Sequence, residues 1–497
     1  LKHHMLKEEL MDKPAMEGLE DLEPTPATPE LRTWTWTVFA GAWATMMVNA
    51  ATFSSGAALL SLGLSVYETL LAQTIGALLL VIGLCLNAAA GVKYGIPFPV
   101  FARSSFGSAG AHFCTLSRGG VAIMWLSFQA WQGALGIYTS LERVFGSRWL
   151  EDWGHLGNNL NVSKLTILIL YLALHAVLIH FGPAKLKRWI NLVLPVVMLG
   201  MLGIAIWAAS LASFPEAMEA AEEHRPLEIG SKTDAFMTAV NSSLSSWSTL
   251  LLNVCDLSRF SPTQKDQVLG QSMGIPIPFV LTLFSGMWLA GATHVAYGKA
   301  VWMIPECFAY WNPVVSVFSG LLLALSTLMV NVLANIISPI NDFMNLAPQH
   351  FSYRGCGYVV LILSLLVCPW WTFSGKVSFV LNFLTGYAMI TGAIAGVFLA
   401  DYWILKATIL DIKELYSATG VNWKALLAVF CGAAPCVPGF INALLVHGED
   451  QENLVSPFWA HLYTGGSCLF SLATSGIMYL IFNKIAPKKS LTIEPCK

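Results

Sequence analysis

Amide and indole side chains recur at helical spacing within apolar stretches of this sequence. Trp125 and Gln129 lie four residues apart in IMWLSFQAWQGALG, and Asn331 and Asn335 lie four apart in LSTLMVNVLANIISP. Residues four apart share one face of a helix. An amide both donates and accepts hydrogen bonds, so these pairs match the polar edge of a pyrimidine, purine or hydantoin ring.

A flat ring also needs partners for its faces. Trp125 and Trp247 stand in different apolar stretches, and two indoles can sandwich a ring, with each stacked face worth about 0.5–1.5 kcal/mol. Asn49 supplies a further amide, and Ser246 a hydroxyl beside Trp247. The natural complement of this set is a neutral, planar, hydrogen-bonding solute.

Amide, tryptophan and histidine side chains in membrane helices can also have purely structural roles. Amides in membrane helices often only bond a neighbouring helix, for about 0.6 kcal/mol on average. Packing or interfacial positions are the expectation for three more tryptophans, Trp34, Trp36 and Trp131. Histidines can relay protons, but we expect structural roles for His112, His175 and His180.

The elements that must position these side chains are membrane helices. Of the 497 residues, 56% are hydrophobic and 11% charged, against about 25% charged in soluble domains. Apolar runs of about 18 or more residues indicate spanning helices, and about twelve occur here. The net charge of -2 argues against nucleic acid as a partner, and the ten cysteines form no CxxC pair.

The pattern predicts an all-α integral membrane protein with a third helix that extends beyond the bilayer. The expected helices are 34–61, 66–90, 107–144, 164–182, 188–212, 233–257, 269–293, 312–339, 356–373, 377–404, 421–446 and 456–483.

Charge placement predicts the orientation. The short segment FGPAKLKR (181–188) is purely basic, whereas the segments 216–228 and 449–452 are mainly acidic. Because cytoplasmic loops are enriched in Lys and Arg, both termini are expected inside. Residues 1–32 and 484–497 are predicted as cytoplasmic tails, and the first is proline-bearing, acidic and expected to be disordered.

Small polar clusters predict two broken helices. Thr45–Asn49 in the first helix and Asn241–Ser248 in the sixth occupy corresponding positions of two five-helix halves, 33–212 and 233–404. Inverted repeats with broken first helices are common in secondary transporters. The segment 421–483 adds two C-terminal helices.

Charged residues within the spans argue against other classes of protein. Those considered stand near predicted helix ends: Glu68, Asp256, Asp342 and Asp401. An ion or amino-acid carrier usually needs a committed charge deep in the membrane. No nucleophile, acid–base pair or metal cluster suggests an enzyme.

Several motifs in order resemble the nucleobase–cation symporters of the hydantoin, allantoin, cytosine and uracil permease group. The most specific is GVKYGIPFPVFARSSFG (91–107). The others are WLSFQAWQGA, NVCDLSRF, NVLANIISPINDF, GAIAGVFLADYWIL and LYSATGVNWKAL. The resemblance covers nearly the whole chain after about residue 32 and implies a five-plus-five inverted-repeat fold of the LeuT type with two extra helices.

The resemblance also implies site roles. The substrate ring would stack between Trp125 and Trp247, while three amides would face it: Gln129, Asn335 and Asn49. An Asn at the first-helix position is similar to allantoin-type members, which favours allantoin or uracil; cytosine, purines and hydantoin remain open. Asn331, one turn before Asn335, and Ser246 complete the candidate set.

The sequence departs from the sodium-coupled members of this group. Their ion lies between first-helix carbonyls, which correspond to Thr45 and Val48, and eighth-helix hydroxyls, which correspond to Met329 and Val330. Met and Val side chains cannot ligate a hard cation. Ser326, with Thr327, lies one turn earlier, so a shifted site stays open. No cofactor is expected, and proton coupling or uniport is favoured over sodium.

The resulting hypothesis is a secondary transporter that imports a planar nitrogen heterocycle by alternating access. A bacterial inner or other plasma membrane is the expected location, and a monomer is the working expectation. The alternatives are a transporter of the same fold for an amino acid or vitamin, and a sodium-coupled hydantoin-type symporter. A membrane enzyme or receptor is the alternative from a different class.

Overall fold

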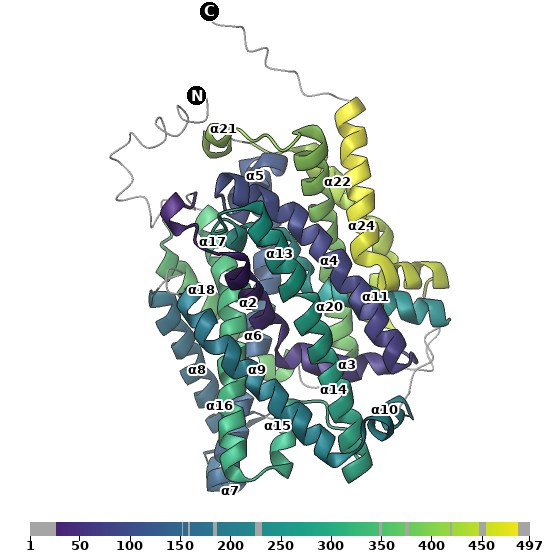
Figure 1. Cartoon of the computed structure of the whole chain (residues 1–497). Helices are drawn as coiled ribbons and strands as arrows, with labels where there is room; N and C mark the ends of the chain where they lie inside the picture. Colours follow the sequence, from purple (N-terminus) through teal and green to yellow (C-terminus); the bar gives the residue numbers. More distant parts are fainter. Residues whose placement is uncertain are drawn as a thin grey trace, which may run out of the picture.

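The computed structural model describes residues 26–151, 153–157, 160–181, 186–223, 231–346, 350–372, 377–417, 420–446 and 454–485. These residues form a helical bundle with one short hairpin (Figure 1). The first half contains η1 (Pro29–Leu31), α2 (Trp36–Met47), α3 (Ala50–Leu60), α4 (Val66–Tyr94), α5 (Phe98–Phe106), α6 (Ser108–Phe145), α7 (Ser147–Glu151), β1 (His155–Gly157), β2 (Leu160–Asn161), α8 (Val162–Phe181), α9 (Leu186–Leu211) and α10 (Phe214–Glu223). Strands β1 and β2 are antiparallel.

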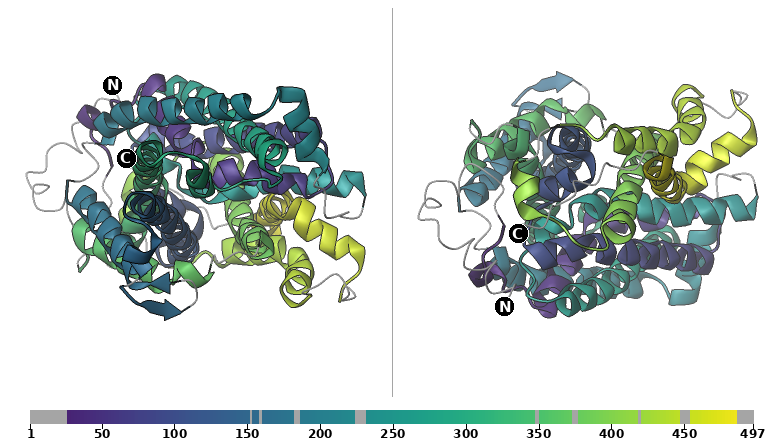
Figure 2. Two further views of the ribbon diagram at one scale, coloured as in Figure 1. Left: turned by 90° about the horizontal axis from the view of Figure 1, so that it is seen from below. Right: turned by 90° about the horizontal axis from the view of Figure 1, so that it is seen from above.

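In the rest of the chain, the described residues form helices and the segments that join them. It contains α11 (Lys232–Asn253), α12 (Cys255–Ser258), α13 (Gln264–Gly274), α14 (Pro276–Tyr297), α15 (Ile304–Cys307), η3 (Phe308–Tyr310), α16 (Pro313–Val330), η4 (Asn331–Ile336), α17 (Ile337–Leu346), α18 (Tyr353–Leu366), α19 (Pro369–Thr372), α20 (Val377–Leu399), η5 (Ala400–Leu405), α21 (Ile412–Ser417), α22 (Trp423–Ala433), η6 (Ala434–Cys436), α23 (Val437–Leu445) and α24 (Pro457–Ile485). Helices α22, α23 and α24 lie at one side of the bundle (Figure 2).

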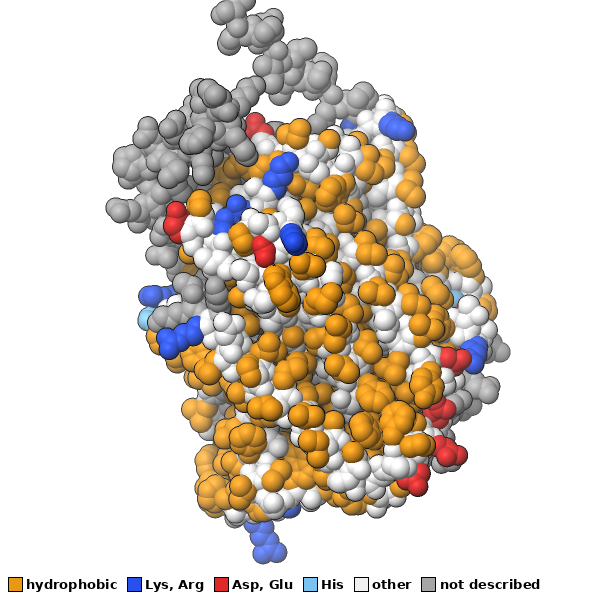
Figure 3. Space-filling view, in the orientation of Figure 1, with side chains coloured by type: hydrophobic (Ala, Val, Ile, Leu, Met, Phe, Trp, Pro, Cys, Tyr) orange, Lys and Arg blue, Asp and Glu red, His pale blue; other side chains and the backbone are white. Residues whose placement is uncertain are grey.

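The outer surface is that of a membrane protein. Among the described residues, eight helical segments are long and apolar enough to cross a bilayer. Large apolar side chains point outward, as Ile82, Leu199 and Leu281 do at 58%, 67% and 58% exposure. Figure 3 shows an apolar band across the middle of one face, with most of the Lys and Arg toward the upper end, while Asp and Glu lie toward both ends. Lipid is the solvent that such a band fits.

Eight of the twelve predicted helices contain these apolar segments, and the other four differ for physical reasons. The helix predicted at 34–61 is divided into α2 and α3, and α18 has only 14 residues. The remaining two, α6 and α11, are long but carry many polar side chains. The polar α6 and α11 carry the two tryptophans expected to hold a ring.

One of the two predicted helix breaks is present. Helix α2 ends at Met47, and Asn49 then begins α3 as its N-cap, with its side-chain oxygen accepting from the amides of Ala51 and Thr52 at 2.8 and 3.1 Å. The break expected at Asn241–Ser248 is absent, because α11 runs unbroken to Asn253. Three of the serines there, Ser242, Ser246 and Ser248, bond to carbonyls of their own helix, as Ser246 Oγ does to the Ser242 carbonyl at 2.8 Å. Ser243 Oγ instead donates to the carbonyl of Gln73 on α4 at 3.2 Å.

The ordered part of the chain begins earlier than predicted. Residues 26–32 were expected within the disordered tail, yet the amide of Ala27 donates to the carbonyl of Gly95 at 2.8 Å, and Arg32 Nε donates to the carbonyl of Arg259 at 3.4 Å. The first described residues and the end of α24 lie toward the same end of the bundle (Figure 1). The predictions for residues 1–25 and 486–497 fall outside the described residues.

A backbone contact fixes how α3 lies against α14. A Cβ added to Gly56 would collide with the carbonyl of Leu283, and one added to Gly286 would collide with the carbonyl of Phe53. Two helices can approach this closely only through residues without side chains. The two glycines therefore hold the second half of the broken helix in place.

We expect Gly286→Ala to destabilise the protein by about 1–3 kcal/mol, because the methyl group must push α3 away from α14. Gly203→Ala on α9 is the control, since its Cβ would meet no atom within 4 Å. Thermal unfolding of both variants in detergent tests this expectation. If Gly286→Ala melted at the same temperature as Gly203→Ala, the close contact between α3 and α14 would be contradicted.

Candidate functional site

Two of the predicted amides are joined in an irregular turn of the eighth predicted helix. Asn331 and Asn335 lie in η4, a π-helical turn between α16 and α17. Asn335 Nδ2 donates to Asn331 Oδ1 at 3.1 Å, and both side chains are buried. Single π-helical turns inside longer helices often mark functional positions.

The amides of Gln129 and Asn49 also meet. Gln129 Nε2 on α6 points to Asn49 Oδ1 at 3.4 Å, while its Oε1 is buried and has no hydrogen-bond partner among the described residues. Asn49 is otherwise occupied by its own helix break, since its Nδ2 donates to Met46 O at 2.7 Å and Thr52 Oγ1 at 2.8 Å. The structure thus gives Asn49 a capping role and leaves Gln129 Oε1 open.

A tyrosine on α20 connects the helices of the two expected ring-stacking residues. Trp125 Nε1 on α6 donates to Tyr387 Oη at 3.3 Å, and that hydroxyl donates to the carbonyl of Ser246 on α11, also at 3.3 Å. Trp247 follows on α11, which contacts α6, and both indoles pack on one apolar cluster. Tyr387 was not among the predicted site residues. The signal was present, because the hydroxyl of a tyrosine inside an apolar span needs a hydrogen-bond partner.

Phe383 on α20 is a further aromatic neighbour of Trp125. The two rings lie 6.2 Å apart between centroids and are tilted by 55°. Phe383 stands one turn before Tyr387 on α20, with their rings 5.0 Å apart. Trp125 is half-buried and Trp247 is 9% exposed. The arrangement offers aromatic faces and amide edges, and Tyr387 also interacts electrostatically with Arg118 on α6.

A group of buried charges lies farther along the same helices. Arg118, seven residues before Trp125 on α6, is fully buried. The sequence interpretation did not include it among the charged residues of the predicted spans. It interacts electrostatically with Asp342 and Asp256, which are also buried. The Arg118 guanidinium donates to the carbonyl of Ala334, and Asp256 Oδ1 accepts from the amide of Phe98 at 3.0 Å.

The buried arginine corrects the expectation that charges stay near helix ends. Arg118 lies within the predicted span 107–144, in the sequence SRGG. An intramembrane arginine is itself a sign of a buried acidic partner, so this signal was available in the sequence. Asp342 also departs from this expectation, because it is the sixth of the ten residues of α17.

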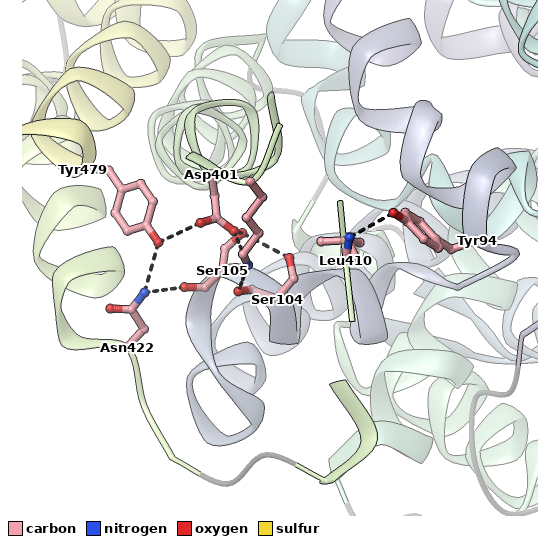
Figure 4. A network of polar contacts seen from close by, with 8 residues as sticks. Tyr94, Ser104, Ser105, Asp401, Leu410, Asn422 and Tyr479 are labelled. Atoms are coloured by element: carbon pink, nitrogen blue, oxygen red, sulfur yellow. Dashed lines mark hydrogen bonds and ion pairs between the residues drawn. The ribbon is translucent and has the colours of Figure 1, made fainter. Parts of the chain in front are cut away.

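Asp401 belongs to a separate, fully bonded network (Figure 4). Its carboxylate accepts from Lys406 Nζ at 2.7 Å, Ser105 Oγ at 2.8 Å and Tyr479 Oη at 3.1 Å. Asn422 Nδ2 donates to Tyr479 Oη at 3.1 Å and to the Ser105 carbonyl at 2.7 Å. The network ties α5, η5 and α24 together, so Asp401 has a structural role.

We expect Tyr479→Phe to cost about 1.5–3 kcal/mol of stability, because a buried carboxylate loses a donor and Asn422 loses an acceptor. Thermal unfolding in detergent measures the loss. Tyr358→Phe, at a tyrosine with 41% exposure, is the control and should leave the melting temperature unchanged. A Tyr479 variant as stable as the control would show that the network contributes little.

The residues of the expected degenerate sodium site are partly brought together. Ser326 Oγ on α16 donates to the carbonyl of Val48 at 3.1 Å, next to the helix break. Thr45 Oγ1 is engaged with the carbonyl of Gly41 at 2.8 Å, and Met329 and Val330 carry no side-chain oxygen. Among the described residues, no group of three or more His, Cys, Asp and Glu side chains could hold a metal ion.

Comparison with known proteins agrees with this architecture. A family model for permeases for cytosine/purines, uracil, thiamine and allantoin matches residues 26–456. An allantoin permease of Bacillus subtilis is 31% identical, with 96% of this chain and 95% of the relative covered. A purine-uracil permease of Arabidopsis thaliana is 27% identical, with 95% and 78% covered.

Solved structures share the fold. A nucleobase-cation-symport-1 family transporter, closed with bromovinylhydantoin bound, has a TM-score of 0.74 at 19% identity, with 94% of this chain and 97% of that chain covered. The crystal structure of MhsT in complex with L-phenylalanine has a TM-score of 0.53 at 14% identity, with 89% and 97% covered. The fold and the relatives define a multi-pass membrane transporter rather than an enzyme.

The chain belongs to the family of permeases for cytosine and purines, uracil, thiamine and allantoin. The LeuT-type fold expected from the sequence is confirmed at the level of its solved neighbours. The exact number of spans and the bounds of the two repeats stay predictions.

Proposed function

We propose that this permease carries a neutral, planar nitrogen heterocycle, with allantoin or uracil as the first candidates and cytosine, purines and hydantoin as further ones. The observation that carries the proposal is the buried Oε1 of Gln129, which has no hydrogen-bond partner within the described part of the chain and lies on the same helix as Trp125, one turn away. A buried acceptor without a donor costs free energy until a ligand supplies one. The relatives named for allantoin and uracil support this substrate class.

The mechanism we propose assigns separate tasks to rings and amides. Trp125 and Trp247 would select planarity by stacking, while Gln129 and Asn335 would select the hydrogen-bonding edge. A ligand lacking a donor for Gln129 Oε1 would leave that atom unpaired, at a cost of about 1–3 kcal/mol. Asn331 would act behind Asn335, to which it is bonded.

Alternating access would expose this site to one side of the membrane at a time. We propose import into the cytoplasm across a plasma or bacterial inner membrane, with both termini cytoplasmic, because Lys and Arg gather at one end of the face in Figure 3. Proton coupling or uniport is favoured, since Ser326 donates to the Val48 carbonyl that a sodium ion would need. A monomer would suffice.

Trp125→Ala and Trp247→Ala should each weaken ring binding about tenfold, because each variant removes one stacked face. Binding is measured on purified protein with allantoin, uracil, cytosine, adenine, guanine and hydantoin. Trp149→Ala, at an exposed tryptophan on α7, is the matched control. Binding of an amino acid in place of every ring compound would overturn the substrate class and leave only the fold.

Sodium should not change the affinity for the ring compound by more than about twofold, because the expected hydroxyl ligands are missing at Met329 and Val330. The same binding measurement, with sodium replaced by choline, tests this. Ser326→Ala and Ser326→Thr test whether Ser326 only donates to the Val48 carbonyl or also binds a sodium ion. Sodium-enhanced binding that Ser326→Thr keeps and Ser326→Ala loses would establish a shifted ion site.

A further inference from the structure

A fully buried histidine on α8 lies behind the amide pair of η4. His175 has no exposed surface, and neither ring nitrogen is free. Its Nδ1 lies 2.8 Å from the carbonyl of Tyr171, and its Nε2 lies 3.1 Å from Asn331 Nδ2. Neither the Tyr479–Asp401 network nor the stacking tryptophans involve this residue.

The contacts of His175 fix its tautomer. A carbonyl oxygen can only accept, so Nδ1 must carry the proton that is donated to Tyr171. In a neutral imidazole the other nitrogen is then an acceptor, and Asn331 must present its NH2 group to Nε2. The carbonyl of Leu126, 3.4 Å from Asn331 Nδ2, requires a donor in the same place. Two independent acceptors, on α8 and on α6, therefore determine that the NH2 end of the Asn331 amide faces them.

The orientation is passed on to Asn335. Because the NH2 group of Asn331 faces His175 and Leu126, its oxygen faces Asn335 and accepts from Asn335 Nδ2 at 3.1 Å. The oxygen of Asn335 is thereby left over, because Asn335 uses its NH2 group for the bond to Asn331. The oxygen of Gln129 is also left over, since it is buried and has no hydrogen-bond partner among the described residues. The two amides of the candidate site both have an acceptor to offer.

We infer that His175, as the neutral Nδ1–H tautomer, is a positioning residue that holds Asn335 with its oxygen toward the substrate and so sets the polarity of the site. The inference rests on the proposed function in that Asn335 faces the ligand. The ligand class follows from two offered acceptors. The site takes heterocycles with N–H groups at two ring positions, such as ureides and imides, in preference to rings with a bare nitrogen acceptor there.

The first experiment reads the tautomer directly and needs no substrate. The protein is labelled with ¹⁵N-histidine, purified in detergent, and its ring nitrogens are observed by NMR at pH 7, with His175 assigned by its absence in His175→Gln. We expect the neutral Nδ1–H form, which is the minor tautomer of free histidine. An Nε2–H form or an imidazolium would overturn the inference, whatever the protein transports.

The second experiment reads the polarity of the site. Hypoxanthine and uracil carry a ring N–H where adenine and cytosine carry a bare nitrogen, so the affinity ratio within each pair reports the preference for donors. His175→Leu removes the acceptor for Asn331, frees both amides to turn, and should lower this ratio about tenfold. His175→Gln keeps an acceptor oxygen near the Nε2 position and should preserve the ratio.

The control is His180→Leu, at an exposed histidine of the same helix, which should not change the ratio. If His175→Leu weakens both members of a pair equally, His175 only supports the helix packing and the inference is wrong. If His175→Leu does not fold, the ratio in His175→Gln and the NMR spectrum decide. If no ring compound binds the unmodified protein, the proposed function fails, and the NMR spectrum still tests the tautomer.

Discussion

The break between Met47 and Ala50 places backbone groups without helical partners inside a membrane protein, where water cannot satisfy them. The structure supplies substitutes from side chains. Asn49 caps the start of α3, and Ser326 on α16 donates to the carbonyl of Val48. An unpaired polar group in hydrocarbon costs several kcal/mol, so the helices that supply these partners cannot be placed independently of the break. The position of α3, through Gly56 and Gly286, follows from the same constraint.

The polar helices of this fold are tolerable because apolar helices surround them. Helices α6 and α11 are not apolar enough to count as spans, but each buries its polar side chains against other helices. The buried charges show the same principle, since Arg118 would be very costly in lipid and instead lies near Asp342 and Asp256. Polar residues can therefore gather in the middle of the molecule only where packing shields them, and there they can bind a polar ligand.

The sequence allowed most of the helices to be predicted, because runs of apolar residues are a direct consequence of lipid as the solvent. Residue types and spacing also brought out the pairs Trp125–Gln129 and Asn331–Asn335 before any contact was known. Contacts between distant segments could not be predicted in this way. Tyr387 bonds Trp125 across 262 residues of sequence, and Ser243 on α11 donates to the carbonyl of Gln73 on α4.

The amides of the site illustrate why local pattern is insufficient for specificity. An asparagine offers a donor and an acceptor, so its presence alone does not tell a ligand's N–H group from a bare nitrogen. The distinction arises when one end of the amide is committed elsewhere, as Asn331 commits Asn335 and as Asn49 engages Gln129. Such commitments are made before the ligand arrives, so little reorientation is needed on binding. Selectivity for a neutral ring can then come from the bonds behind the site as much as from the side chains that face it.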